Sequence, residues 1–138
     1  MRGFTQDDAH LFCMPEQLQS EFESTADEAI RLIDAFGFTG VEYYLSRRPE
    51  AERTETDPIA EDAIRNALES RGLPYQVDEE GGAFYGPKLD INVRDAIGRR
   101  WQLGTVQVDF ILPRRFDLKY IGSDGAEHMP VMLSLIHI

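Results

Sequence analysis

One stretch of the chain, residues 88–112, reads KLDINVRDAIGRRWQLGTVQVDFIL. Polar and apolar side chains alternate along residues 88–94. This two-residue period is typical of a strand with one buried face and one solvent-exposed face. Residues 95–98 have the composition of a turn, and residues 100–112 continue as a second strand rich in branched and aromatic side chains. The pattern predicts an antiparallel hairpin made of these two strands.

Two helices are predicted before this hairpin. Residues 15–37 open with a proline, which suits a first helical turn, and close with a glycine, which suits a helix end. Apolar residues recur between them at spacings of three and four, as on one face of an amphipathic helix: Leu18, Phe22, Ala26, Ile30 and Ile33. A second helix is predicted over residues 58–70.

Shorter strands are predicted at residues 9–13, 40–45, 73–77 and 116–121. Strands neighbour strands in this order, and helices fall between only some of them. The sequence therefore favours an α+β fold with a largely antiparallel sheet flanked by helices over a doubly wound parallel sheet.

The composition limits the functions that the chain can have. Its 138 residues correspond to one domain or part of one, and 42% are hydrophobic, which is enough for a packed core. Acidic residues number 25 against 14 basic ones, for a net charge of −11. Such a surface repels phosphate backbones, so any contact with RNA is expected outside this chain.

The cysteine content and hydropathy indicate a cytoplasmic location. Cys13 is the single cysteine, which excludes an internal disulfide and fits a reducing compartment. No apolar run approaches the roughly 20 residues that cross a bilayer, and the first ten residues lack the apolar core of a signal peptide. We therefore expect no membrane partner.

Three polar segments interrupt otherwise strand-like sequence, at residues 3–10, 82–88 and 101–109. Simple alternation along the third segment places Gln102 on the face of Val106, and Thr105 on the opposite face with Gln107. Neither face is then cleanly apolar, and buried polar groups need hydrogen-bond partners. A polar ligand lying on the sheet would supply them.

Each of these residues also has an ordinary structural explanation when it is taken singly. His10 near Asp8 is typical of a hydrogen-bonded pair, and Tyr85 beside glycines is typical of packing. If the chain were an acidic interaction module without a small-molecule site, the polar residues of the three segments would scatter over the surface instead of converging.

Taken together, the segments resemble threonyl-tRNA synthetases. The end of motif 2 in that family is similar to GFTQDDAHLFC, and the segments after it are similar to AFYGPKLD and WQLGTVQVDFILPRRFDLKYIG. Their order and spacing agree with the family over about residues 1–133. The pair of Asp8 and His10 favours the threonyl member, because related class II synthetases lack a histidine there. The alternatives are another class II synthetase or a non-catalytic paralogue.

The resemblance implies a class II synthetase core, in which helices flank an antiparallel sheet. Enzymes of that family join threonine to ATP, supplied with magnesium, to give threonyl-adenylate and pyrophosphate, and then transfer threonyl to threonine tRNA. The tRNA is expected to bind mainly through domains outside this chain, and the parent protein is expected to be a homodimer.

The resemblance also implies roles for nine residues. The threonine-binding positions match Gln6, Asp8, Tyr85, Lys88 and Gln107. The ATP-binding positions match Phe4, Gln102 and Thr105. His10 matches one ligand of a zinc ion that the family holds with one cysteine and two histidines.

The chain departs from the family at the zinc site. The family's cysteine ligand would precede Met1, and Ser134 stands where the second histidine is expected, so His10 is the one ligand of three. We predict that residues 1–133 are part of a synthetase catalytic domain, between the end of motif 2 and motif 3. Residues 134–138 are predicted to be a non-native tail. With no complete catalytic set, the isolated chain is predicted to be inactive.

Overall fold

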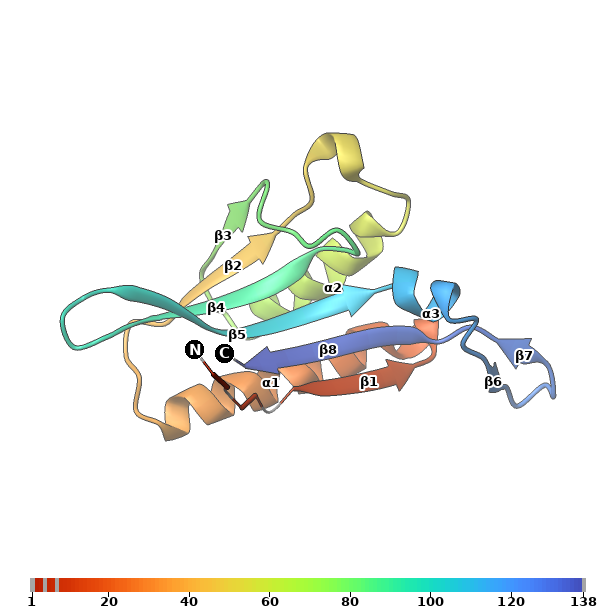
Figure 1. Cartoon of the computed structure of the whole chain (residues 1–138), viewed down its shortest axis with the longest axis horizontal. Helices are drawn as coiled ribbons and strands as arrows, with labels where there is room; N and C mark the ends of the chain where they lie inside the picture. The colour runs from red at the N-terminus through yellow and green to blue at the C-terminus, as the bar shows by residue number, and fades with distance from the viewer. Residues whose placement is uncertain (1, 4, 7, 138) are drawn as a thin grey trace.

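The computed structural model describes all residues except 1, 4, 7 and 138, and of residue 137 the backbone only. Within that part of the chain a mixed sheet has the strand order β1-β8-β5-β4-β2-β3 (Figure 1). The strands are β1 (Ala9–Cys13), β2 (Glu42–Ser46), β3 (Tyr75–Asp78), β4 (Lys88–Arg94), β5 (Arg100–Asp109) and β8 (Val131–His137). Of these pairs, β2 and β3 run parallel and the others antiparallel, so the predicted fold class is confirmed.

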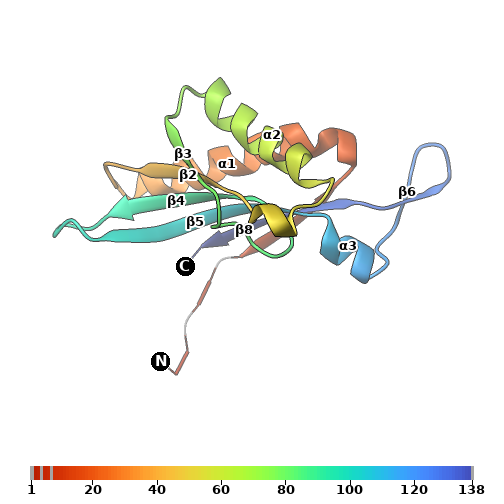
Figure 2. The same cartoon turned by 90° about the horizontal axis from the view of Figure 1, so that it is seen from above.

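Two helices cover one face of this sheet. They are α1 (Leu18–Ala35), which follows a short 3-10 turn at Pro15–Gln17, and α2 (Asp57–Ser70), which follows another at Glu50–Glu52. Figure 2 shows both helices on the same side of the strands. We call this side the helix face and the opposite side the open face. The core lies on the helix face, where Phe22, Ile64, Leu89 and Val106 are fully buried.

The hairpin predicted at residues 88–112 forms, but its second strand is shorter than predicted. β5 ends at Asp109, and Ile111–Arg115 form the short helix α3. Asp109 explains the change, because its Oδ1 accepts hydrogen bonds from the N–H groups of Ile111 at 2.7 Å and Leu112 at 2.9 Å. A carboxylate in this position satisfies the first amides of a helix.

The strand predicted at residues 116–121 is wrong for its first four residues. The Phe116 N–H donates to the Leu112 carbonyl at 3.0 Å, which extends the turn of α3, and Asp117 has a φ of +50°. Only Tyr120–Ile121 forms a strand, β6, which pairs with β7 (Glu127–His128) away from the main sheet. A turn at residues 123–125 joins them.

The C-terminal residues complete the sheet. β8 lies between β1 and β5, and Ser134 is buried within it. The foreign origin predicted for residues 134–138 stays a prediction, because the place of residues 134–137 in β8 does not test it. Among the described residues, no helix is both long and apolar enough to cross a membrane.

Candidate functional site

One row of side chains crosses the open face from edge to edge. The register pairs each residue of this row with the next, on six successive strands: His10, Ser134, Gln107, Lys88, Ser46 and Asp78. All six are polar or charged, whereas the rows on the helix face are apolar. Three of the residues predicted from the sequence, His10, Lys88 and Gln107, are thereby brought onto one line.

A buried carboxylate organises the next row. Oδ1 of Asp90 accepts hydrogen bonds from Gln102 Nε2 at 2.6 Å and Thr105 Oγ1 at 3.0 Å. Its Oδ2 accepts from Ser46 Oγ at 2.7 Å and lies 2.9 Å from Lys88 Nζ. We call these five residues the Asp90 cluster. It joins Lys88, Gln102 and Thr105 of the predicted site through a residue that the prediction did not include.

The predicted facing of Gln102 is wrong. The pairing between β4 and β5 shifts register, since Ile91 lies opposite Gly104 while Asn92 lies opposite Gln102. Leu103 is therefore the extra residue of a β-bulge, and a single extra residue moves the following side chains to the other face. Gln102 consequently joins Thr105 on the open face, and its Nε2 lies 2.7 Å from Thr105 Oγ1.

Tyr85 reaches this face from a tight loop between β3 and β4. A Cβ added to Gly82 would lie 2.5 Å from the Arg47 carbonyl carbon, and one added to Gly86 would lie 2.5 Å from the Val108 carbonyl oxygen. Gly82 therefore lets the loop pack against the backbone that follows β2, and Gly86 lets it pack against β5. The Tyr85 hydroxyl donates a hydrogen bond to Gln107 Oε1, so Tyr85 and Gln107 act as one unit.

The Tyr85 hydroxyl remains protonated at neutral pH. Burial raises its pKa, the nearby carboxylates of Asp109 and Asp90 raise it further, and the hydrogen bond to Gln107 opposes them. Asp109 is itself buried, and no described residue donates to its Oδ2. Tyr85 is therefore available to this surface as a neutral hydroxyl.

A buried ion pair holds the loop that carries Tyr85. Arg48 is 4% exposed, and it donates to both carboxylate oxygens of Asp57, to Thr54 Oγ1 at 2.8 Å and to the Phe84 carbonyl at 2.9 Å. Burial alone would raise the pKa of Asp57, but hydrogen bonds from Arg48 and Thr54 bring it below its ordinary value. The pair fixes the backbone next to Tyr85.

The zinc site implied by the resemblance is not complete in this chain. His10 Nδ1 lies 2.9 Å from Ser134 Oγ, and Ser134 is the position where the resemblance predicts a histidine. Among the described residues, no three His, Cys, Asp or Glu side chains form a group that fits a metal ion. A single imidazole does not fit a zinc ion of structural affinity.

The remaining predicted residues lie before or at the edge of the sheet. Gln6 and Asp8 are exposed and precede β1. Phe4 lies outside the described residues, so its predicted stacking on adenine stays a prediction. Sequence reasoning missed Asp90 and Ser46. The alternation of Lys88, Asp90 and Asn92 was the available signal for Asp90, whereas Ser46 had none because its contact is with a residue 44 positions away.

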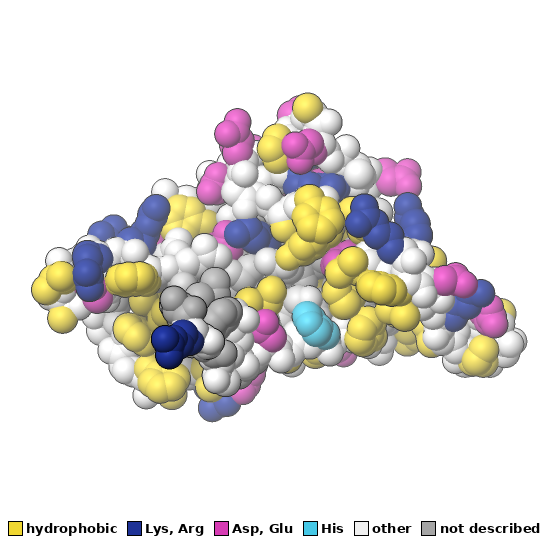
Figure 3. All heavy atoms as spheres, in the orientation of Figure 1, with side chains coloured by type: hydrophobic (Ala, Val, Ile, Leu, Met, Phe, Trp, Pro, Cys, Tyr) yellow, Lys and Arg dark blue, Asp and Glu magenta, His cyan; other side chains and the backbone are white. Residues whose placement is uncertain are grey.

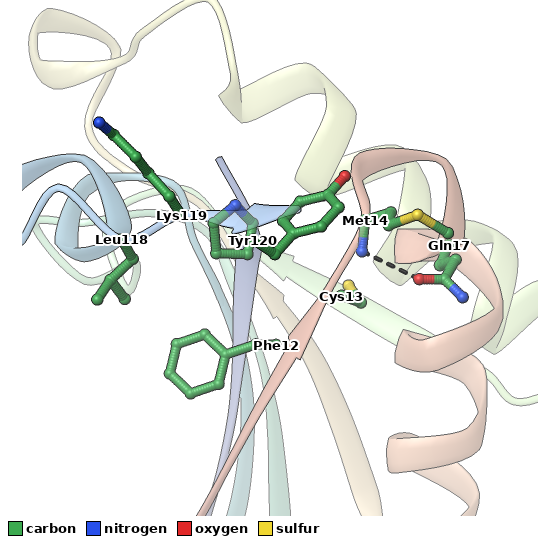
Figure 4. A pocket seen from close by; sticks show the side chains of 8 residues that line it. Phe12, Cys13, Met14, Gln17, Leu118, Lys119 and Tyr120 are labelled. Carbon is green, nitrogen blue, oxygen red and sulfur yellow. Dashed lines mark hydrogen bonds between the residues drawn. The ribbon is translucent and has the colours of Figure 1, made fainter. Parts of the chain in front are cut away.

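Two hollows differ in character. The Asp90 cluster borders a polar hollow of about 280 Å³ on the open face, next to Tyr44, Asn92 and Arg100. A second hollow, of about 420 Å³, lies where β1 meets the segment before β6, and Figure 4 shows Phe12, Cys13, Leu118 and Tyr120 around it. The second is mainly apolar and contains none of the predicted site residues.

Apolar side chains also appear on the open face. Figure 3 shows some of them on the half that leads towards α3 and β6, where basic and acidic side chains lie beside them, and others at the opposite end. Phe12 and Phe84 are both more than half exposed. The polar row and the Asp90 cluster thus adjoin an apolar area, a combination that is typical of small-molecule binding surfaces.

The fold and the sequence define a class of protein. Residues 1–136 match the family described as the tRNA synthetase class II core domain (G, H, P, S and T), and the chain belongs to that family. An apo histidyl-tRNA synthetase from S. aureus has the same fold, with a TM-score of 0.68 at 12% identity, over 99% of this chain and 37% of that one.

Within this class, the chain is similar to threonyl enzymes, as the sequence resemblance predicted. Proteins named threonine–tRNA ligase are 49% identical in Aquifex aeolicus (strain VF5) and 52% identical in Nitrosococcus oceani. Each alignment covers 96% of this chain and 21% of the relative, so the chain spans about a fifth of their length. A structure described as the RNA binding domain of threonyl-tRNA synthetase from Cryptosporidium parvum Iowa II has a TM-score of 0.88 and 39% identity, covering 97% of this chain and 34% of that one.

Proposed function

We propose that this chain forms part of the substrate-binding surface of a threonine–tRNA ligase. That enzyme would activate threonine with ATP to threonyl-adenylate, release pyrophosphate, and transfer threonyl to threonine tRNA. The observation that carries the proposal is the continuous polar row on the open face, in a chain about half identical to proteins named for this activity.

The two rows of the open face suggest how the substrates would be divided. Lys88, Gln107 and Tyr85 lie on or over the first row, and we assign them to the amino acid. Thr105 belongs to the second row and Gln102 lies beside it, and we assign them to ATP, Gln102 as the contact and Thr105 as the residue that supports it. The predicted contribution of Gln6 and Asp8 would come from the segment before β1.

The activation step needs little covalent chemistry from such a surface. A threonine carboxylate oxygen attacks the α-phosphorus of ATP, and the bond from that phosphorus to the pyrophosphate oxygen breaks. Negative charge shifts towards the leaving group, so positioning and positive charge lower the barrier. The Lys88 ammonium, held 2.9 Å from Asp90, is one cation on this face, and Arg100 beside the polar hollow is another.

Several finer points belong to the same proposal. Magnesium would accompany ATP, the parent enzyme would be a homodimer, and threonine tRNA would bind mainly outside this chain. A cytoplasmic location belongs to the proposal, and the single cysteine, Cys13, which is buried and unpaired, is compatible with it. Because the described residues do not fit a zinc site, no step is assigned to zinc here.

The test is a chimaera in which residues 1–133 replace the matching segment of the Aquifex aeolicus threonine–tRNA ligase. We expect it to catalyse ATP–pyrophosphate exchange that depends on threonine. The isolated 138-residue chain, assayed beside it, should show no exchange. A Lys88→Met version of the chimaera should lose about tenfold or more, the factor that corresponds to one charged hydrogen bond.

Two outcomes would favour the alternatives. Exchange that depends on another amino acid would indicate a different class II synthetase. A folded chimaera with no exchange for any amino acid would indicate a non-catalytic paralogue. Tyr85, Gln102 and Gln107 lie on one face of the sheet, which argues against the acidic interaction module, whereas Gln6 and Asp8 precede β1.

A further inference from the structure

Asp90 has no acceptor capacity left for a substrate. A carboxylate offers about four lone-pair positions. The described donors occupy two on each oxygen, with Gln102 and Thr105 on Oδ1 and Ser46 and Lys88 on Oδ2. Asp90 is also only 6% exposed. Its carboxylate therefore faces inward, and its effect on a ligand must pass through its neighbours.

The contact with Asp90 determines which way the Gln102 amide points. An ionised carboxylate only accepts hydrogen bonds, so the group that faces Asp90 must be the Gln102 nitrogen. The same Nε2 also lies 2.7 Å from Thr105 Oγ1, whose own hydroxyl proton goes to Asp90. Both N–H groups of Gln102 are thereby used, and its carbonyl oxygen is the atom left to face outward.

Gln102 opens onto the polar hollow, whereas Thr105 does not. Gln102 is exposed and lines that hollow, while Thr105 is 3% exposed and uses its hydroxyl both to donate and to accept. Thr105 therefore lies behind Gln102. A ligand in the hollow would meet the Gln102 carbonyl oxygen, which attracts donors and repels anionic oxygens.

We propose that Asp90 is a positioning residue that orients Gln102 with its carbonyl oxygen towards the ligand, so that this point of the surface takes a hydroxyl or amino group and not a phosphate oxygen. This inference rests on the proposed function, since it specifies which part of an adenylate can lie against Gln102. It also assigns to Asp90 the placement of the Lys88 ammonium.

The first test needs no ligand. In the 138-residue chain with labelled nitrogen, the two Gln102 side-chain amide protons should give separate NMR signals that exchange slowly with water. Asp90→Asn replaces one acceptor oxygen by an NH2 group, so these signals should move towards those of a free amide. Asp124→Asn is the matched control, because Asp124 lies in the turn between β6 and β7, outside the polar row and the hollow, and accepts from the Ala126 N–H.

The second test is binding of a hydrolysis-resistant threonyl-adenylate analogue, in which a sulfamate joins threonine to adenosine. Asp90→Asn should weaken binding by about tenfold to a hundredfold, and Asp124→Asn by less than about threefold. Unchanged Gln102 signals in a folded Asp90→Asn variant would overturn the inference, and so would equal losses of affinity in the two variants.

The two tests separate this inference from the proposed function. If the unmodified chain fails to bind the analogue, the assignment of this surface to the adenylate fails. The Gln102 signals would still report whether Asp90 orients the amide. Thermal denaturation of each variant shows whether a changed signal reflects local reorientation or loss of the fold.

Discussion

The two faces of the sheet are built from the same strands but are buried for different reasons. On the helix face, apolar side chains such as Leu89 and Val106 are completely buried under α1 and α2. On the open face, the adjacent residues Asp90 and Thr105 are nearly as buried. They are held there by hydrogen bonds, since the Thr105 hydroxyl donates to the Asp90 carboxylate. Burial of apolar side chains stabilises the helix face directly. Burial of polar groups destabilises the open face unless each group has a hydrogen-bond partner. The open face therefore specifies orientation more than it provides stability.

The largest effect should come from breaking the helix face. Phe22→Ala removes a fully buried ring from α1, and large-to-small changes of this kind cost about 3–5 kcal/mol. Denaturant unfolding should show this loss in the free energy of unfolding. Phe36→Ala is the control, because Phe36 is 78% exposed and its loss should be within about 0.5 kcal/mol.

The ion pair under the Tyr85 loop should give the next largest effect. Arg48→Met leaves the buried Asp57 carboxylate without its partner, which costs about 3 kcal/mol or more. The double variant Arg48→Met/Asp57→Asn removes the stranded charge and should recover part of the loss. If the two variants were equally stable, the pair would not be the element that holds the loop.

The same ion pair predicts a dependence on pH. Because the pKa of Asp57 is lowered in the folded state from its ordinary value of 3.8, its contribution is complete above that pH and is lost as the pH falls through the folded value. Unfolding free energies measured between pH 6 and pH 2 should fall less steeply below about pH 4 in Asp57→Asn than in the unmodified chain. Parallel curves would contradict this prediction.

The same change, glycine to alanine, can be made on each side of the sheet, at Gly82 in the Tyr85 loop and at Gly104 in β5. A Cβ at Gly82 would lie 2.5 Å from backbone atoms under the Tyr85 loop, whereas one at Gly104 would lie 3.6 Å from the Ile91 side chain. Gly82→Ala should therefore cost about 1–3 kcal/mol and displace Tyr85 from Gln107. Gly104→Ala should change stability by less than about 1 kcal/mol. Thermal denaturation measures both.

The sequence predicted the helix face better than the open face, because periodicity reports which side chains are apolar. The strand at residues 88–94 and the apolar positions of α1 are confirmed. The facing of Gln102 was wrong because the bulge at Leu103 depends on how β5 pairs with β4. Arg48 is buried although its sequence neighbours are polar, because its charge is neutralised by Asp57, and such a pairing leaves no periodic pattern in the sequence.

The proposal that the open face binds an adenylate is tested most directly by NMR. Chemical-shift changes are mapped on the 138-residue chain when the sulfamate analogue is added. Changes are predicted at Tyr85, Lys88, Gln102 and Gln107, with none at buried positions of α2 such as Ile64. Changes confined to the helices or to the apolar hollow beside Cys13, or no changes at millimolar analogue, would contradict it.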